Sequence, residues 1–274
     1  MKFEQSIKVA AIAALLAHSA ASHALEWSDN YVGLKVGDRF SEPGITPTIR
    51  KNIYEFVHVS GDKLGKNLLV GQVLQSGAND PAVGGTAGAQ EFFGFYRRSF
   101  SLSKITGGAM AFGPVKDVSL VGRVDRGTKN ITFAPAARKF MAGVAFDLAV
   151  PKGYAEASVY AYSEKNHNGI IGKDVNFDTT VRADLNWGIP FNPGIPLEWR
   201  GGLAVTGKKG NDGFGNATKP EMRLYTELLT PVAALPGVMV GVAYEMWRNK
   251  YGANQKTVPG AKQNGLMLVA EYHF

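Results

Sequence analysis

The sequence predicts an all-β fold, a transmembrane antiparallel β-barrel of about twelve strands with short periplasmic turns and longer extracellular loops. Three observations predict it. Several segments alternate strictly between apolar and polar residues, the N-terminus has the pattern of a secretory signal, and the last segment alternates up to a C-terminal aromatic residue. Together they indicate strands that turn apolar side chains to lipid and ionic side chains to an aqueous lumen.

The clearest alternation lies between Val175 and Trp187. One face carries Val175, Phe177, Thr179, Val181, Ala183, Leu185 and Trp187, and the other carries Asn176, Asp178, Thr180, Arg182, Asp184 and Asn186. Successive side chains of a strand point to opposite faces, so one face is dry and the other wet. Reversing the strand would place Arg182 in lipid, at a cost of roughly 2–4 kcal/mol near the bilayer midplane.

Five further segments alternate in the same way, and each sets apolar residues against ionic ones. Their apolar faces are Val118, Leu120 and Val124; Phe140, Val144, Phe146 and Leu148; Leu197, Trp199, Leu203 and Val205; Met222, Leu224 and Leu228; and Val238, Val240, Val242, Tyr244 and Met246. Weaker candidate strands lie near Tyr31–Arg39, Ile49–Val59, Leu68–Ser76, Phe92–Leu102 and Tyr154–Tyr162. With Gly265–Phe274 the count reaches about twelve, an even number that puts both chain termini on the periplasmic side of the membrane.

The connections are expected to sort by length between the two ends of the barrel. Counting from a periplasmic N-terminus, residues 151–153 and 231–237 become periplasmic turns, while 77–90, 207–220 and 249–263 become outer loops. Ser103–Pro114 is longer than a periplasmic turn should be. The most apolar stretch, Leu228–Tyr244, is broken by Pro231 and Pro236 and therefore predicts strand, turn and strand rather than a spanning helix.

Residues 1–24 are predicted to be a cleavable signal peptide, which leaves residues 25–274 as one barrel domain. Lys2 and Lys8 precede the apolar run Val9–Ala17, and Ser22-His23-Ala24 fits a small-x-small cleavage site. A buried helix is the alternative interpretation of this segment. The sequence contains no cysteine, so a disulfide framework does not stabilise the exported protein.

A secreted soluble sandwich would also show alternating strands, and the C-terminus favours the membrane barrel. Leu266, Leu268, Ala270, Tyr272 and Phe274 share one face, whereas Glu271 and His273 share the other. This pattern resembles the terminal strand by which the barrel assembly machinery recognises its substrates, with Phe274 as the expected contact. Trp187, Trp199 and Tyr272 suit the aromatic girdles of such barrels, so we expect a bacterial outer-membrane location.

The formal net charge is +7, but the lysine and arginine residues are scattered and form no basic run. Nucleic-acid binding is therefore not favoured. We hypothesise instead that the loop residues Lys208, Lys209 and Lys219 face anionic lipopolysaccharide at the cell surface.

Several stretches resemble one family of outer-membrane proteins. They are Ser99-Phe100-Ser101-Leu102-Ser103-Lys104-Ile105-Thr106-Gly107, Phe112-Gly113-Pro114-Val115-Lys116-Asp117, and Arg50-Lys51-Asn52-Ile53-Tyr54-Glu55. The sequence resembles the nucleoside-specific channel-forming family (Tsx-like, including the OmpK group), although Ser99 and Ser103 replace the family's arginine and acidic residue, and His58 stands where acidic character is expected. The resemblance implies a monomeric barrel with a narrow lumen, nucleoside uptake, and surface loops that phages use as receptors.

The wet faces supply the candidate pore lining. It comprises Arg123, Asp125, Asp178, Arg182, Asp184, Glu198, Arg200, Arg223, Tyr225, Glu227, Glu245 and Trp247. Tyr225, Trp247, Tyr160 and Tyr162 are candidate stacking faces for a nucleoside, although Tyr160 and Tyr162 fit an interface girdle equally well. The alternative is that the charges pair with one another and fill the interior.

The predicted function is an outer-membrane channel for passive uptake of small polar solutes, with nucleosides as the expected permeant. The alternatives are a general small-solute porin and a plugged structural or adhesive barrel, and an outer-membrane lipase-type enzyme is least favoured. No Gly-x-Ser-x-Gly elbow, His-Glu-x-x-His pair or Walker loop occurs, so no enzyme activity and no cofactor are predicted. Asn211-Asp212-Gly213 lacks the later glutamate of a calcium loop, so no metal is predicted.

Overall fold

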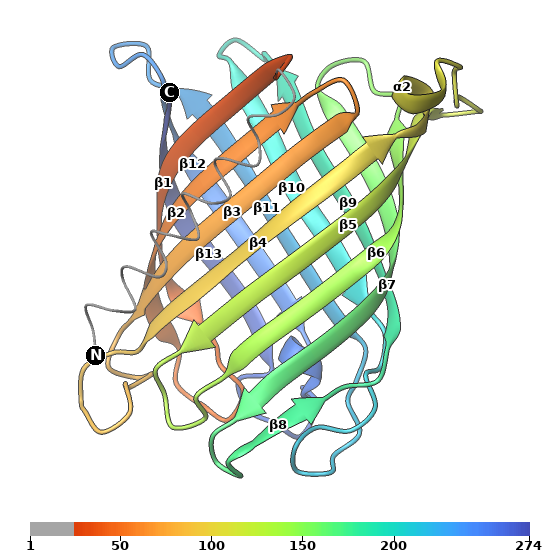
Figure 1. Cartoon of the computed structure of the whole chain (residues 1–274). Coiled ribbons are helices and arrows are strands. Elements are labelled where there is room, and N and C mark those ends of the chain that lie inside the picture. The colour runs from red at the N-terminus through yellow and green to blue at the C-terminus, as the bar shows by residue number, and fades with distance from the viewer. Residues whose placement is uncertain (1–24) are drawn as a thin grey trace.

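The computed structural model describes residues 25–274, which form one closed β-barrel (Figure 1). The predicted signal peptide, residues 1–24, lies outside the described residues. The strands are β1 (Trp27–Phe40), β2 (Ile49–Gly61), β3 (Gly65–Ser76), β4 (Gln90–Ser101), β5 (Val115–Lys129), β6 (Ala136–Leu148), β7 (Tyr154–Asn168), β8 (Lys173–Asn176), β9 (Thr180–Phe191), β10 (Leu197–Thr206), β11 (Glu221–Pro231), β12 (Val238–Arg248) and β13 (Lys262–His273). Two short helical turns, α2 (Leu102–Thr106) and η2 (Lys250–Gly252), lie between strands.

Closure comes from pairing the first strand with the last. β1 pairs antiparallel with β13, where Tyr31 lies opposite His273, and β6 pairs with β7 to complete the ring. Twelve strands thus have a neighbour on each side, while the short β8 pairs only with the end of β7. Closure of these twelve strands leaves no unpaired edge in the ring, which a barrel in hydrocarbon requires because an unsatisfied backbone group there costs several kcal/mol. The predicted antiparallel barrel of about twelve strands is confirmed.

The two ends of the barrel differ as the connection lengths predict. One end, which we call the turn end, carries the C-terminus, α2 and the predicted turns at 151–153 and 231–237 (Figure 1). The opposite end, the loop end, carries β8 and the predicted outer loops at 77–90, 207–220 and 249–263. The unusually long connection after Ser103 contains α2, which Ser101 caps by accepting from the Lys104 N–H and which Gly107 ends in the left-handed conformation (φ 71°).

The burial pattern of the barrel is the reverse of that of a water-soluble protein. In β13 the outward Leu266 and Leu268 are 66% and 69% exposed, whereas the inward Gln263 and Glu271 are 1% and 2% exposed. The same parity holds in β5, β6, β10, β11 and β12, where the predicted apolar residues face outward. The predicted faces of these strands are therefore confirmed. No helix among residues 25–274 is long and apolar enough to span a membrane.

The strand predicted from Val175 to Trp187 is interrupted. β8 pairs Asn176 with Lys165, whereas β9 pairs Thr180 with Tyr162, so residues 177–179 oppose only two residues of β7. This one-residue bulge shifts the alternation by one position, so even-numbered residues point inward in β9 but outward in β8. The predicted faces are confirmed from Thr180 onward and are wrong before it.

Aromatic side chains gather on the outside near the turn end. The rings of Trp187 and Trp199 lie 5.2 Å apart, and Gly201 makes room for Trp187, since a Cβ at that glycine would lie 2.4 Å from the indole ring. The Trp199 indole N–H donates to Thr226 Oγ1 at 2.7 Å, so its polar atom is satisfied on an apolar face. This placement matches the predicted aromatic girdle.

A charge on the outer face should be far more costly than the loss of apolar surface alone. Leu268 lies near the middle of β13 with its side chain outward. Leu268→Arg should therefore lower the free energy of unfolding of the barrel in phospholipid vesicles by roughly 2–4 kcal/mol. Urea titration of folding measures this, and Leu268→Ala is the matched control that removes the side chain without adding charge. An equal loss in the two variants would contradict a lipid-facing Leu268.

Candidate functional site

All of the predicted pore-lining residues except Asp178 point into the barrel. Arg200 in β10 contacts Glu271 in β13 at 2.5 Å, and Arg123 in β5 approaches Asp184 in β9 at 3.9 Å. These strands are not neighbours in the sheet, so their side chains meet on the concave inner face. The inward set is Arg123, Asp125, Arg182, Asp184, Glu198, Arg200, Arg223, Tyr225, Glu227, Glu245 and Trp247.

Asp178 is the exception because it lies in the bulge between β8 and β9. It is exposed, and its backbone N–H donates to the carbonyl of Lys209 at the loop end. The prediction that Asp178 lines the pore is therefore not matched by its position.

The first charged cluster on the inner wall joins five strands. Lys35 Nζ lies 2.8 Å from Glu55 and 3.6 Å from Glu227, while Arg200 lies 2.8 Å from Glu227 and 2.5 Å from Glu271. All three carboxylates are buried, so each depends on these two cations for its stabilisation. This cluster ties β1, β2, β10, β11 and β13 together across the lumen.

The second cluster lies on the opposite part of the wall and consists of three arginine–carboxylate pairs. They are Arg97 with Glu156 (2.5 Å), Arg123 with Asp125 (2.7 Å) and Arg182 with Asp184 (2.7 Å). The carboxylates are buried, whereas the guanidinium groups keep part of their surface accessible. Arg123 also lies over the ring of Phe95, 3.9 Å from its centroid. The groups on this wall that a solute in the lumen can reach are therefore mainly guanidinium groups.

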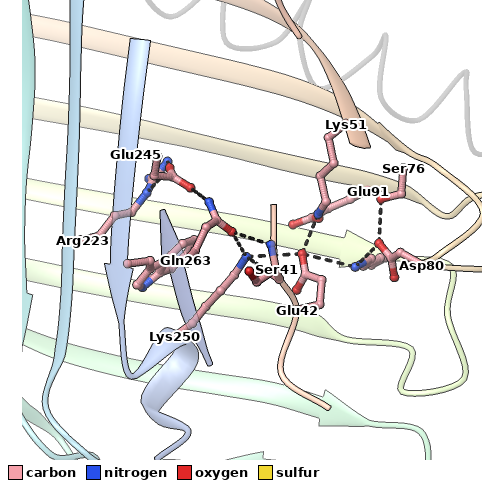
Figure 2. Close-up of polar contacts among 12 residues, drawn as sticks. Ser41, Glu42, Lys51, Ser76, Asp80, Glu91, Arg223, Glu245, Lys250 and Gln263 are labelled. Atoms are coloured by element: carbon pink, nitrogen blue, oxygen red, sulfur yellow. Dashed lines mark hydrogen bonds and ion pairs between the residues drawn. The ribbon is translucent and has the colours of Figure 1, made fainter. Parts of the chain in front are cut away.

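A third network occupies the mouth at the loop end (Figure 2). Glu42, from the β1–β2 loop, lies 2.5 Å from Lys51, 3.4 Å from Lys250 and 3.5 Å from Lys129. Lys129 in turn lies 2.7 Å from Asp80, which belongs to the β3–β4 loop. All five side chains are buried, so three loops, β1–β2, β3–β4 and β12–β13, are held inside the mouth by ion pairs rather than lying free on the surface.

Burial and charge act in opposite directions on the loop groups of this network. Burial opposes ionisation of Glu42, but Lys250, Lys51 and Lys129 together hold the pKa of its carboxyl below the usual range. Burial lowers the pKa of Lys250, and Glu42 opposes that effect. The Glu42 carboxylate is thus the anion that Lys51, Lys129 and Lys250 share.

The network continues to the inner wall through Gln263, which donates to Glu245 and lies 3.1 Å from the Lys250 ammonium (Figure 2). Glu245 pairs with Arg223 at 2.5 Å, yet the Arg223 side chain is 41% exposed while that of Glu245 is 6% exposed. Because Arg223 points inward, its exposed surface indicates water-accessible space within the barrel. Trp247 lies beside it, with the guanidinium 5.0 Å from the indole ring.

Several inner-wall residues escaped the sequence analysis. Phe40, Ile49, Ile53, Met267 and Val269 form an apolar cluster inside the barrel, so the inner face is not uniformly polar. The ionic residues that were missed include Lys35, Glu42, Lys51, Glu55, Arg97, Lys129, Glu156 and Lys250, whereas Glu271 lies on the face that the sequence predicted to be polar. Lys35 was detectable, since Val32, Leu34 and Val36 alternate with it, but in β2 the inward Ile53 and Val57 conceal the pattern.

Two further expectations require correction. Tyr160 and Tyr162 point inward rather than into an interface girdle, and both are buried, so neither presents an open stacking face. Lys209 does not face the surface, because its ammonium is buried 2.5 Å from Glu164, which also accepts from Tyr162. Lys208 remains exposed and Lys219 is half-buried.

No family model and no curated protein matches the sequence. Among solved structures, the translocator domain of the autotransporter NalP from Neisseria meningitidis is similar over 97% of this chain and 98% of its own, at 13% identity and a TM-score of 0.46. The NanC porin is similar over 88% and 98%, at 9% identity and a TM-score of 0.46. The β-domain of the Bordetella autotransporter Brka is similar over 90% and 99%, at 10% identity and a TM-score of 0.41.

Removing the Glu42 charge should release the mouth network. In Glu42→Gln, three buried lysines lose their shared anion, and an uncompensated buried charge costs about 3–5 kcal/mol. We expect the β1–β2 loop to leave the mouth, with a several-fold rise in amine labelling of Lys51, Lys129 and Lys250 measured by mass spectrometry. Glu26→Gln is the control, because its pair with Lys104 is exposed, and it should change nothing. Unchanged labelling in Glu42→Gln would contradict the clamp.

The same network should respond to acid in one direction. Because the pKa of Glu42 is lowered in the folded protein, its contribution is complete above the unfolded value of about 4.3 and is lost as the pH falls below it. Hydrogen exchange of residues 41–48, corrected for intrinsic rates, should stay constant from pH 8 to about 5 and rise at lower pH. In Glu42→Gln, residues 41–48 should exchange fast over the whole pH range. If that variant showed an acid transition as large as that of the wild type, Glu42 would be excluded as the cause of the transition.

Proposed function

We propose that this protein is an outer-membrane channel through which small polar solutes pass passively. The observation that carries the proposal is the accessible guanidinium surface on an inner wall that is enclosed by an apolar exterior. A structural barrel has no need for accessible charge inside, whereas a channel needs polar groups that replace part of the water around a solute. Partly exposed arginines beside buried carboxylates meet that need.

The charges on the wall support selectivity for uncharged or weakly charged solutes. Arginine and carboxylate groups alternate along the second cluster, so neither sign dominates the field there. A solute with strong net charge would meet repulsion from one half of the wall. A neutral solute with several hydroxyl groups can accept hydrogen bonds from the accessible guanidinium groups without meeting a net charge.

Nucleosides are the permeants that we propose first. The inner wall places Trp247 beside Arg223 and Glu221, whose carboxylate accepts from the indole N–H at 2.6 Å. Tyr225 lies next to Glu227 in the same way and donates its hydroxyl to that carboxylate. An aromatic face next to ionic groups suits a base and a ribose together, since the base stacks and the ribose hydroxyls form hydrogen bonds.

The proposal includes the biological setting. The signal peptide is cleaved near Ala24, the assembly machinery recognises the strand ending at Phe274, and the protein works as a monomer. The termini lie at the periplasmic side, so the loop end faces the medium, where lipopolysaccharide surrounds it and phages can attach. The protein has no enzymatic role in this proposal.

A plugged structural or adhesive barrel is the second candidate, and the mouth network favours it. Glu42 and Lys250 bring loop segments into the mouth and bury them there, which narrows the entrance. Single-channel recording in planar bilayers separates the two candidates, because a plugged barrel gives no conductance steps while a channel gives steps that a permeant blocks. Absence of steps in both the wild type and Glu42→Gln would exclude the channel.

Liposome swelling tests the permeant. We expect adenosine to enter faster than a sugar of similar size, because the sugar has no aromatic face to stack on Trp247. Equal rates would contradict nucleoside selectivity and leave a general small-solute porin.

Trp247 should carry much of that preference. Base stacking on an aromatic side chain is worth about 1–3 kcal/mol by alanine substitution, so Trp247→Ala should weaken nucleoside block of the current by roughly tenfold. The matched control is Trp199→Ala, since Trp199 lies on the outer face and should not alter the block. An equal effect in the two variants would rule out stacking in the lumen.

A further inference from the structure

Three basic side chains form a row on the outer face of the barrel near the loop end. Arg126 in β5 lies directly opposite Arg138 in β6, and Arg138 lies directly opposite Lys165 in β7. All three have the parity of the outward-facing residues, since the inward neighbours are Asp125, Lys139 and Glu164. Like charges directly opposite one another destabilise a sheet unless an anion joins them.

The protein supplies one anion for this row. Asp174 in β8 accepts from Arg138 at 2.8 Å and lies 3.1 Å from Lys165 and 2.9 Å from His167 Nδ1. Contacts with His167, Lys165 and Arg138 hold the pKa of Asp174 lowered to about 2, so it is ionised at neutral pH. Asp174 therefore pairs with two of the three cations of the row, and Arg126 has no ion-pair partner within residues 25–274.

The row lies where the apolar exterior ends on the side of the loop end. One step toward the middle of the barrel, the outward residues of β5 and β6 are Val124 and Phe140, which lie opposite each other, and Phe140 is 58% exposed. Basic groups thus end the apolar face on the side of the loops. A ligand for this row must carry anionic groups immediately above hydrocarbon.

The turn end differs. Its outward arginine, Arg98, is held by both oxygens of Asp62, at 2.8 and 2.9 Å, so its charge is already matched. The outward-facing basic row of Arg126, Arg138 and Lys165, which exceeds the charge of Asp174, lies at the loop end. An unmatched basic row at one boundary and a matched arginine at the other correspond to a bilayer whose two leaflets differ in headgroup charge.

We propose that Arg126, Arg138 and Lys165 form a binding site for the phosphate groups of a phosphorylated glycolipid in the outer leaflet. Guanidinium groups bind phosphate through paired, charge-assisted hydrogen bonds, and the adjacent Phe140 contacts the acyl chains of the same lipid. The inference rests on the proposed outer-membrane location and goes beyond it by naming the residues that select the lipid. It replaces Lys209 as a lipopolysaccharide contact, since that side chain is buried.

Native mass spectrometry of the detergent-solubilised full barrel tests the site with lipid A as the probe. The variant Arg126→Gln/Arg138→Gln/Lys165→Gln should bind lipid A more weakly by roughly tenfold or more. The control Lys63→Gln/Lys152→Gln/Lys256→Gln removes the same charge from exposed turns and a loop that do not belong to the row, and its binding should match the wild type. An equal loss in both variants would overturn the site, because general charge would then explain it.

Two further probes identify the source of the phosphate. Dephosphorylated lipid A should bind to the wild type about as weakly as intact lipid A binds to the row variant. If the wild type bound both lipids equally, the acyl chains alone would explain binding and the phosphate site would be rejected. Inorganic phosphate at the same concentration should not displace lipid A, and displacement would overturn a lipid site. Insertion of the barrel into vesicles is measured separately. If the barrel inserts but shows no preference for lipid A, the lipid site is rejected while the proposed membrane location stands.

Discussion

The requirement that every backbone hydrogen bond be satisfied within a closed sheet determines the rest of this structure. Hydrocarbon offers no partner for a free N–H or C=O group, so the first and last strands must pair, as β1 and β13 do from Tyr31 to Val36. Once the sheet is closed, alternate residues of each strand have only two destinations, the lipid and the lumen. The apolar parity of β13 and the ionic parity of β9 follow from that division.

Closure also forces ionic side chains into a confined interior, where an unpaired charge is costly. The structure meets this cost by pairing almost every inner carboxylate with a guanidinium or ammonium group, as Glu227 shows between Lys35 and Arg200. The pairing is unequal in exposure, because the carboxylates are buried against the wall while arginines such as Arg223 project into accessible space. The residues that satisfy the buried charges are therefore also the ones that present charge to the lumen.

The sequence predicts the strands and faces wherever ionic residues of one parity oppose apolar residues of the other. It fails where that contrast is weak, as in β2, whose inward Ile53 and Val57 stand beside Glu55. It fails at residues 177–179 because a bulge depends on the pairing with β7 and leaves no mark in local periodicity. Lys209 was wrongly assigned to the surface and Glu42 was missed for a third reason, since their partners Glu164 and Lys250 are distant in sequence and only the closed barrel brings them together.

The mouth network acts on the same seam that closes the barrel. The β1–β2 and β12–β13 loops flank the pairing of β1 with β13, and the Lys250 ammonium donates to the Ser41 carbonyl at 2.6 Å while the Ser41 N–H donates to Gln263 at 3.0 Å. At the turn end, the Phe274 N–H donates to the Asn30 carbonyl at 2.9 Å. The seam joins the most distant parts of the chain, so its loop-closure entropy is the largest in the barrel, and polar contacts at both ends offset it. Glu42 consequently has two effects that oppose each other in a channel, because the contacts that secure the seam also narrow the entrance.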